Sequence, residues 1–200
     1  MKLHFTVRQI AFSGILAAVY AAVTIATASF AYGPIQFRIA EALAVLCCFE
    51  PTAVVGMTLG CFIANIFSTV GPLDMAVGTL ATLIAALCMV RWRKPWQMIW
   101  PNVISNGVLI GLLIAFYAAA DTPEFFWTIF AVSGLEVAGG ELAVMVVLGL
   151  PLWYYLDRSQ VLKKLNFQET VKKKTLTGDT TCGIVVKLSR SFSLQRRQSP

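Results

Sequence analysis

The stretch "IAFSGILAAVYAAVTIATASFA", residues 10–31, contains no charged side chain and consists mostly of Ala, Ile, Val and Phe. A helix of about 20 such residues can cross the roughly 30 Å hydrocarbon core of a bilayer. A helix also satisfies its own backbone hydrogen bonds in lipid. The stretch is longer than the apolar region of a cleaved leader, and more apolar runs follow it. It therefore predicts a first transmembrane helix.

The rest of the chain has the same character. Of its 200 residues 58% are hydrophobic and only 13% are charged, whereas a soluble domain carries about 25% charged residues. The mean hydropathy is +0.73. Apolar runs predict six transmembrane segments, at residues 9–31, 36–49, 51–69, 74–92, 97–119 and 125–156. The sequence thus predicts an all-α, polytopic membrane protein whose membrane domain comprises residues 1–165. Its second segment is short and is expected to cross where protein, rather than lipid, surrounds it.

Basic residues orient these segments. Lys2 and Arg8 precede the first segment, residues 91–94 contain the basic run "RWRK", and Arg158 follows the sixth segment. With six crossings these groups fall on one side, so the positive-inside rule places both termini in the cytoplasm. The net charge of +6 does not indicate nucleic-acid binding, because its excess lies from Arg158 onward. Residues 166–200 are polar and basic, and we expect a disordered cytoplasmic tail there.

Charged side chains also occur within the predicted second segment. Arg38 and Glu41 are three residues apart and share a helix face. Charges inside a membrane are costly, and they usually face a partner or a cavity. The pair is therefore either a structural ion pair, which lowers the burial cost of both charges, or part of a ligand site. Asn65 is either an interhelical hydrogen-bonding group or a ligand contact, and Asp74 is either a first-turn acid or a ligand contact.

The fifth and sixth segments add amides and carboxyl groups. Asn102 and Asn106 lie one turn apart. We expect Asn102 to satisfy the backbone beside Pro101 and Asn106 to face a ligand. Glu136 and Glu141 are five residues apart and do not share a helix face. We favour Glu141 for the site, because the two glycines before it allow a close approach.

Small residues at helical spacing predict close helix packing. GxxxG pairs occur at Gly56 and Gly60 and at Gly107 and Gly111. The first segment carries the longest set of small residues, which is Ser13, Gly14, Ala17, Ala18, Ala21, Ala22 and Ala26. This set serves either internal packing or the docking of a partner helix.

Motifs for chemistry are missing from the sequence. It contains no GxxxxGK[ST], HExxH or GxSxG motif and a single histidine, His4. We therefore expect no catalytic residue, no metal and no cofactor. If the chain moves a solute, the energy would have to come from an ion gradient or from another subunit. The cysteines within apolar runs have no metal-ligand spacing and are expected to act as small hydrophobic residues.

Five stretches together resemble the queuosine-precursor transporter family, over about residues 10–157. They are "YGPIQFRIAEAL", "GCFIANIFSTVGPLD", "GTLATLIAAL", "NVISNGVLIGLLIA" and "GGELAVMVVLGLPL". Members of this family are substrate-binding (S) components of energy-coupling factor (ECF) transporters, in the cytoplasmic membrane of prokaryotes. The resemblance implies six membrane helices and a substrate site toward the outer side. It also implies that a small-residue stripe on the first helix, here Ala17, Ala18, Ala21 and Ala22, docks a transmembrane T component joined to two cytoplasmic ATPases.

The resemblance further implies a 7-deazaguanine cargo, such as 7-aminomethyl-7-deazaguanine or queuine. The guanine-like edge of such a molecule offers two adjacent N–H donors, which suit a carboxylate. The substrate-binding candidates are Arg38, Glu41, Asn65, Asp74, Asn106 and Glu141, with Gln36 and Glu136 as weaker candidates. Two alternatives stay open, which are an S component for a different vitamin-like heterocycle and a membrane scaffold without a ligand.

Overall fold

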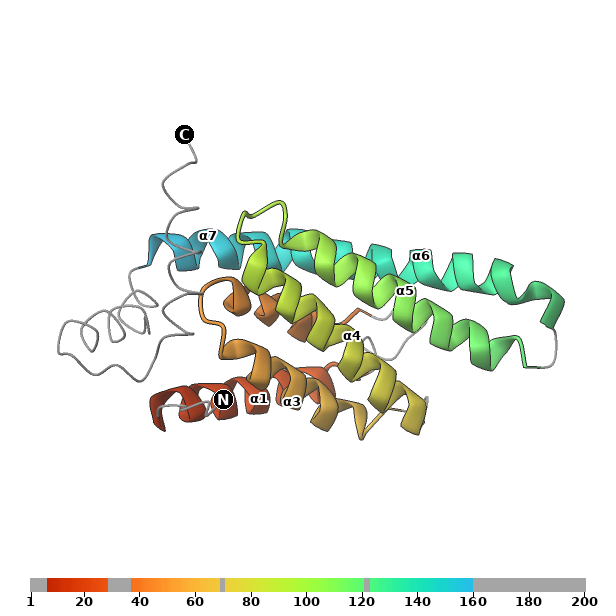
Figure 1. The fold of residues 1–200 in the computed structure, drawn as a ribbon, viewed down its shortest axis with the longest axis horizontal. Coiled ribbons are helices and arrows are strands. Elements are labelled where there is room, and N and C mark those ends of the chain that lie inside the picture. The colour runs from red at the N-terminus through yellow and green to blue at the C-terminus, as the bar shows by residue number, and fades with distance from the viewer. Residues whose placement is uncertain (1–6, 29–36, 69–70, 121–122, 160–200) are drawn as a thin grey trace, which may run out of the picture. The chain divides into compact units, whose positions relative to one another are not determined.

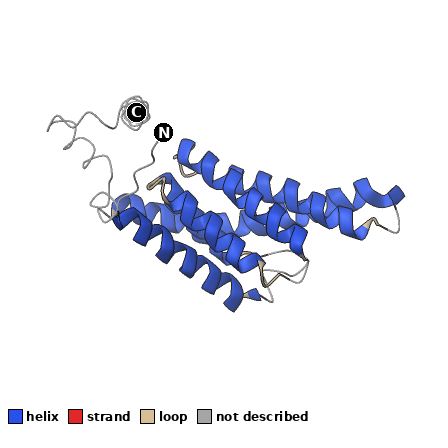
Figure 2. Ribbon diagram, turned by 60° about the horizontal axis from the view of Figure 1, so that its bottom comes forward, coloured by secondary structure: helices blue, strands red, loops and turns tan. Residues whose placement is uncertain are grey.

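The computed structural model describes residues 7–28, 37–68, 71–120 and 123–159, and every regular element among them is a helix (Figure 2). Residue 36 and the predicted tail at 166–200 lie outside the described residues. In chain order the elements are α1 (Val7–Ala26), η1 (Ile39–Cys48), α3 (Ala53–Asn65), α4 (Pro72–Arg91), α5 (Ile99–Ala118), η2 (Pro123–Phe125), α6 (Phe126–Val144), η3 (Met145–Gly149) and α7 (Leu150–Arg158). Each predicted segment coincides with one of these elements or, for the sixth, with the run from η2 to α7.

The helices run back and forth and form a bundle (Figure 1). α1 packs against α3, α3 against α4, α4 against α5, and α5 against α6. α1 begins and α7 ends at the same end of this bundle, on the left of Figure 1, as an even number of crossings requires. The predicted all-α membrane bundle is therefore confirmed.

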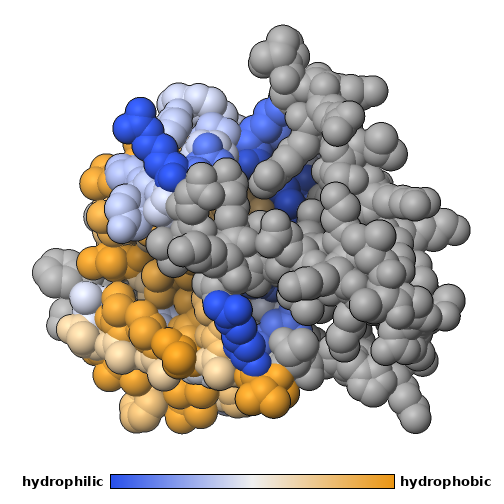
Figure 3. All heavy atoms as spheres, turned by 90° about the vertical axis from the view of Figure 1, so that its left-hand side faces the viewer, coloured by the Kyte–Doolittle hydropathy of each residue, from blue (hydrophilic) through white to orange (hydrophobic). Residues whose placement is uncertain are grey.

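Four of the helical segments are long and apolar enough to cross a membrane. They are Val7–Ala26, Pro72–Arg91, Ile99–Ala118 and the continuous run Pro123–Arg158. Two apolar elements are shorter, namely Ile39–Cys48 and Ala53–Asn65. Viewed from the end where α1 begins, the described surface carries large apolar areas beside patches of hydrophilic side chains (Figure 3). Exposed apolar residues on the sides of the helices are what contact with lipid requires.

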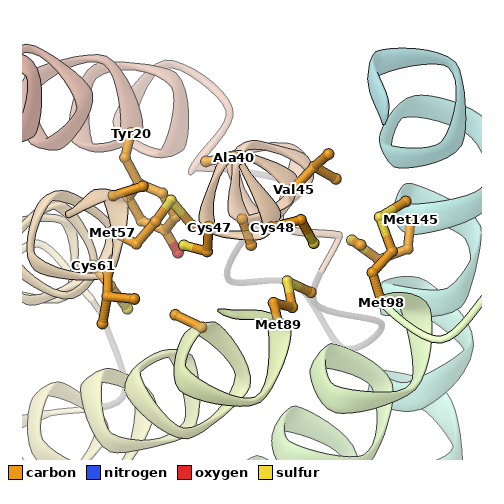
Figure 4. Close-up of a cluster of buried hydrophobic side chains, with 14 of the residues drawn as sticks. Tyr20, Ala40, Val45, Cys47, Cys48, Met57, Cys61, Met89, Met98 and Met145 are labelled. Carbon is orange, nitrogen blue, oxygen red and sulfur yellow. The ribbon is translucent and has the colours of Figure 1, made fainter. Parts of the chain in front are cut away.

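The second predicted segment, η1, is a 3-10 helix of 10 residues. A 3-10 helix rises about 2.0 Å per residue, so η1 reaches further than an α-helix of equal length, and runs beyond 3–4 residues are uncommon. Most of its side chains are buried. Protein therefore surrounds η1, as the sequence predicted. Buried side chains from other helices lie around it, among them Met57, Met89 and Met145 (Figure 4).

Glycines set the closest helix contacts. A Cβ added at Gly60 would lie 2.8 Å from the carbonyl oxygen of Ala17, and one at Gly56 would lie 2.7 Å from that of Ser13. A Cβ added at Gly111 would lie 2.6 Å from the Cα of Gly134. Both GxxxG pairs therefore serve packing within the chain, α3 against α1 and α5 against α6.

Candidate ligand site inside the bundle

Buried polar side chains gather where η1, α3 and α4 meet. Arg38 precedes η1, Asn65 ends α3, and Asp74 lies in the first turn of α4. These side chains are 0–3% exposed. Gly78, one turn after Asp74, makes room for them, because a Cβ there would lie 2.7 Å from Asn65 Nδ2 and 3.5 Å from Arg38 Nη1.

The ion pair of Arg38 differs from the one that the sequence suggested. Arg38 Nη2 lies 3.8 Å from Asp74 Oδ1, in a buried salt bridge. Glu41 is instead bound by two hydroxyl groups, Tyr20 Oη at 2.6 Å and Thr82 Oγ1 at 3.0 Å, both from its Oε1. Arg38 is the N-cap residue of η1, with non-helical backbone angles, and Glu41 lies in the first turn. The start of α4 places Asp74 against the guanidinium, and this tertiary contact decides the pairing.

The carboxyl group of Asp74 makes two contacts in addition to its position in the first turn of α4. Its Oδ2 accepts a hydrogen bond from Ser68 Oγ, and its Oδ1 faces Arg38. Gly71 is the N-cap of α4, and no side chain caps this helix. Asp74 is therefore part of the buried cluster.

A second part of the cluster joins α5 to α6. Asn102 Nδ2 donates to Glu141 Oε2 at 2.9 Å, and both side chains are buried. Asn102 therefore uses its amide across helices, where we expected it to satisfy the backbone beside Pro101. Glu141 also lies near enough to Glu41 and Arg38 to interact electrostatically with both. The two parts therefore lie close enough inside the bundle for their charges to affect one another, and together they form the candidate site.

Many buried polar atoms of Arg38 and of the elements η1, α3, α4 and α5 have no hydrogen-bond partner. These are Arg38 Nε, Nη1 and Nη2, Glu41 Oε2, Asn65 Oδ1, Asp74 Oδ1, Asn102 Oδ1, and Asn106 Nδ2 and Oδ1. A buried polar group without a partner costs about 1–3 kcal/mol, and more if it is charged. Native proteins keep few such groups, so a concentration of them marks a place where ordered water or a bound molecule would supply the missing partners. Both donors and acceptors are free, which suits a polar heterocycle with both kinds of group.

Some predicted residues do not join this cluster. Glu136 is exposed on α6, whereas Glu141 on the same helix is 1% exposed. The five-residue spacing turned the two carboxyl groups to different faces, as expected, and only Glu141 faces inward. Gln36 lies outside the described residues.

Sequence reasoning missed four residues of the site. Tyr20 and Thr82 bind Glu41, Cys61 contacts Asn65 and Thr82, and Gly78 provides space. Cys61 therefore has polar contacts, although it was expected to be a hydrophobic residue only. Tyr and Thr are common in apolar helices, so nothing in the sequence distinguished these residues. In the described part of the chain, no group of three His, Cys, Asp or Glu side chains could hold a metal ion.

The small residues of α1 separate into two faces. Ala17 and Ala21 are buried at 6% exposure, and Ala17 contacts α3. Ala18 and Ala22 are exposed. Gly14 lies on the same exposed face, and a Cβ added to it would meet nothing within 4 Å. Only the exposed face is available to another protein.

Comparisons with known proteins found one family model and one curated relative that are similar to the chain. The family model described as QueT transporter matches residues 10–158, which include every helix of the bundle except the first residues of α1. A curated relative, the queuosine precursor transporter QueT of Lactococcus lactis subsp. cremoris (strain MG1363), is 38% identical over 72 residues. That match covers 35% of this chain and 42% of the relative, so it spans less than half of either protein. No solved structure matches the chain.

Proposed function

The chain belongs to the QueT transporter family, and on this premise we propose that it is the substrate-binding membrane subunit of an importer for a queuosine precursor. The observation that carries the proposal is the set of unpartnered, buried polar atoms contributed by η1, α3, α4 and α5. A membrane scaffold would join its helices with these groups and leave few of them free.

The chemistry of the free groups fits a 7-deazaguanine. The three nitrogens of the Arg38 guanidinium have no hydrogen-bond partner, although Nη2 lies 3.8 Å from Asp74, so the group can donate to a ring carbonyl or a ring nitrogen. Glu41 and Asn65 each offer one free acceptor oxygen to the guanine-like N–H edge. Glu41 accepts two hydrogen bonds at Oε1, so it would contact the ligand through Oε2 alone rather than through both oxygens. Asn106, whose amide is free at both ends, can both donate to and accept from a heterocycle.

The charges of the site favour a cationic ligand. Glu41, Asp74 and Glu141 supply three carboxyl groups, and Arg38 is the only basic residue beside them among the described residues of the cluster. An aminomethyl group is protonated near neutral pH and would compensate this excess. We therefore propose 7-aminomethyl-7-deazaguanine or queuine as the cargo, ahead of uncharged purines.

The proposal includes partners. An ECF importer takes its energy from two cytoplasmic ATPases through a T component, and the exposed small residues of α1, with Ala18 and Ala22, support docking of a T-component helix there. Uptake of the cargo into proteoliposomes should require all four proteins and ATP. Uptake by this chain alone would contradict the ECF part of the proposal.

Thermal unfolding of the detergent-purified protein tests the cargo. A ligand that binds only the folded state stabilises it by about 2.7 kcal/mol at a hundredfold excess over its Kd. We expect such a shift with 7-aminomethyl-7-deazaguanine or queuine, and none with guanine or unrelated vitamins. Glu141→Gln should abolish most of the shift, whereas Glu136→Gln, the same change at an exposed position of the same helix, should leave it intact. If only another vitamin raised the thermal midpoint, that vitamin would be the cargo in place of the 7-deazaguanine. If no compound raised the midpoint, a membrane scaffold would be favoured.

A further inference from the structure

We propose that Tyr20, Cys61 and Thr82 are positioning residues, which hold Glu41 and Asn65 so that one free acceptor oxygen of each faces the ligand. This inference rests on the proposed function, because it concerns the same site. It assigns a function to three residues that carry no free polar atom of their own in the bundle.

The carboxyl group of Glu41 shows the arrangement most directly. Tyr20 Oη and Thr82 Oγ1 both donate to Oε1, at 2.6 and 3.0 Å, while Oε2 is buried without a partner. An oxygen that already accepts two hydrogen bonds has little capacity left. The two hydroxyl groups therefore fix the rotation of the carboxyl group, and Oε2 is the oxygen that remains for a ligand donor.

Asn65 is held in a similar way by a thiol. Its Nδ2 donates to Cys61 Sγ at 3.4 Å, one turn earlier on α3, and its Oδ1 is buried without a partner. Because the thiol takes the NH₂ end of the amide, the carbonyl end is the one left free. Without the thiol, the amide could turn and offer a donor instead.

Cys61 contacts both Asn65 and Thr82, the threonine that binds Glu41. Its Sγ lies 3.2 Å from Thr82 Oγ1 and 3.6 Å from the carbonyl oxygen of Gly78. The Thr82 hydroxyl has a single proton, which it donates to Glu41, so its oxygen is left to accept from the Cys61 thiol. The polar contacts therefore form one connected set, from Asn65 through Cys61 and Thr82 to Glu41, and Tyr20 donates to the same oxygen of Glu41.

This set depends on the packing of four elements. Tyr20 comes from α1, Cys61 from α3, Thr82 from α4 and Glu41 from η1, and all four side chains are fully buried. Tyr20 and Cys61 point into the same interior from neighbouring helices (Figure 4). Their hydroxyl and thiol groups are occupied by protein groups, so these residues act on the ligand through Glu41 and Asn65.

Binding of 7-aminomethyl-7-deazaguanine to purified variants, measured by calorimetry, tests the inference. A hydrogen bond to a charged group contributes about 1.5–3 kcal/mol, which is about tenfold to a hundredfold in Kd. We expect Tyr20→Phe and Thr82→Val to raise the Kd about tenfold or more. Thr82→Ser, which keeps the hydroxyl, should restore the Kd to within about twofold of the original. Thr79→Val is the matched control, since the Thr79 hydroxyl on the same helix bonds only to the backbone oxygen of Met75.

The cysteine provides a second, independent pair of variants. Cys61→Ala should raise the Kd, while Cys61→Ser, which can still accept from the Asn65 amide, should keep most of the affinity.

Thermal midpoints of the ligand-free variants separate an effect on positioning from an effect on folding. The inference would be overturned if the variants lost affinity only in proportion to a lower thermal midpoint, and if Thr82→Ser bound the ligand as weakly as Thr82→Val. Unchanged Kd values in Tyr20→Phe and Thr82→Val would overturn it as well and leave the proposed function standing. If the original protein binds no 7-deazaguanine, both the proposed function and the inference fall.

Discussion

A methyl group added at Gly78 should damage ligand binding while leaving the bundle folded. The Cβ of an alanine there would lie 2.7 Å from Asn65 Nδ2, where ordinary van der Waals contact begins at 3.4 Å. The two guanidinium nitrogens of Arg38 lie at 3.5 and 3.7 Å from the same point, which is ordinary contact. The Asn65 amide must therefore withdraw from α4, and the guanidinium would lie directly against the new methyl group.

Two effects on stability oppose each other in this variant. Gly→Ala within a helix stabilises by about 0.5–1 kcal/mol, because glycine loses more backbone entropy on folding. Added volume in a packed interior costs about 1–3 kcal/mol. The net change in unfolding free energy should be a loss of about 0–2 kcal/mol, which a stable bundle tolerates.

Ligand affinity should change more than stability does. Displacing Asn65 moves its free Oδ1 and disturbs its bond to Cys61, so we expect a Kd about tenfold higher, equivalent to about 1.4 kcal/mol. The assay is a titration with 7-aminomethyl-7-deazaguanine, with the thermal midpoint of the ligand-free protein measured in parallel.

Gly139→Ala is the matched control. It makes the same change within α6, where an added Cβ meets nothing within 4 Å. It should raise the thermal midpoint slightly and leave the Kd unchanged. If Gly78→Ala bound the ligand as well as Gly139→Ala does, the site would not lie against α4, and the reasoning from these contacts would be refuted.

Three further predictions concern packing, charge and docking. Gly60→Ala should lower the unfolding free energy by about 1–3 kcal/mol, because its Cβ would lie 2.8 Å from a backbone oxygen of α1. Gly14→Ala, whose Cβ would have no atom within 4 Å, should not lower it. Equal thermal midpoints for the two variants would contradict the close α1–α3 contact. Arg38→Met should lower the unfolding free energy by about 3–5 kcal/mol, since it leaves a buried carboxylate unpaired; a more stable variant in chemical unfolding would show that the pair is not needed. Ala18→Trp should leave ligand affinity intact and reduce co-purification with a co-expressed T component, whereas Leu135→Trp, at an exposed position on α6, should reduce neither; equal co-purification of both would argue against docking on α1.

The fold class could be predicted because it depends on local properties of the chain. A charge-free apolar run such as residues 10–31 has few alternatives to a membrane helix. The conformation within a segment was less predictable. Ile39–Cys48 reads as a short α-helix but is a 3-10 helix, and Met145–Gly149 forms a π-helix within the last segment. Such changes depend on the packing around the segment, which the local sequence does not record.

The site could be predicted in part. Intramembrane charge is costly wherever it lies, so Arg38, Asp74 and Glu141 stood out as candidates without any structure. The partner of each charge could not be predicted. Arg38 pairs with Asp74 on another helix rather than with Glu41, three residues away.

The sequence by itself determined that this chain is a helical membrane protein and which of its polar residues are unusual, because the cost of polar groups in lipid depends on residue type and run length. Only the tertiary structure decided which atoms are already bound and which are free. Tyr20 and Thr82 use one oxygen of Glu41 and leave the other, and Gly78 lets Asn65 and Arg38 approach α4. These contacts join residues that are far apart in the chain, so they arise only when the helices pack.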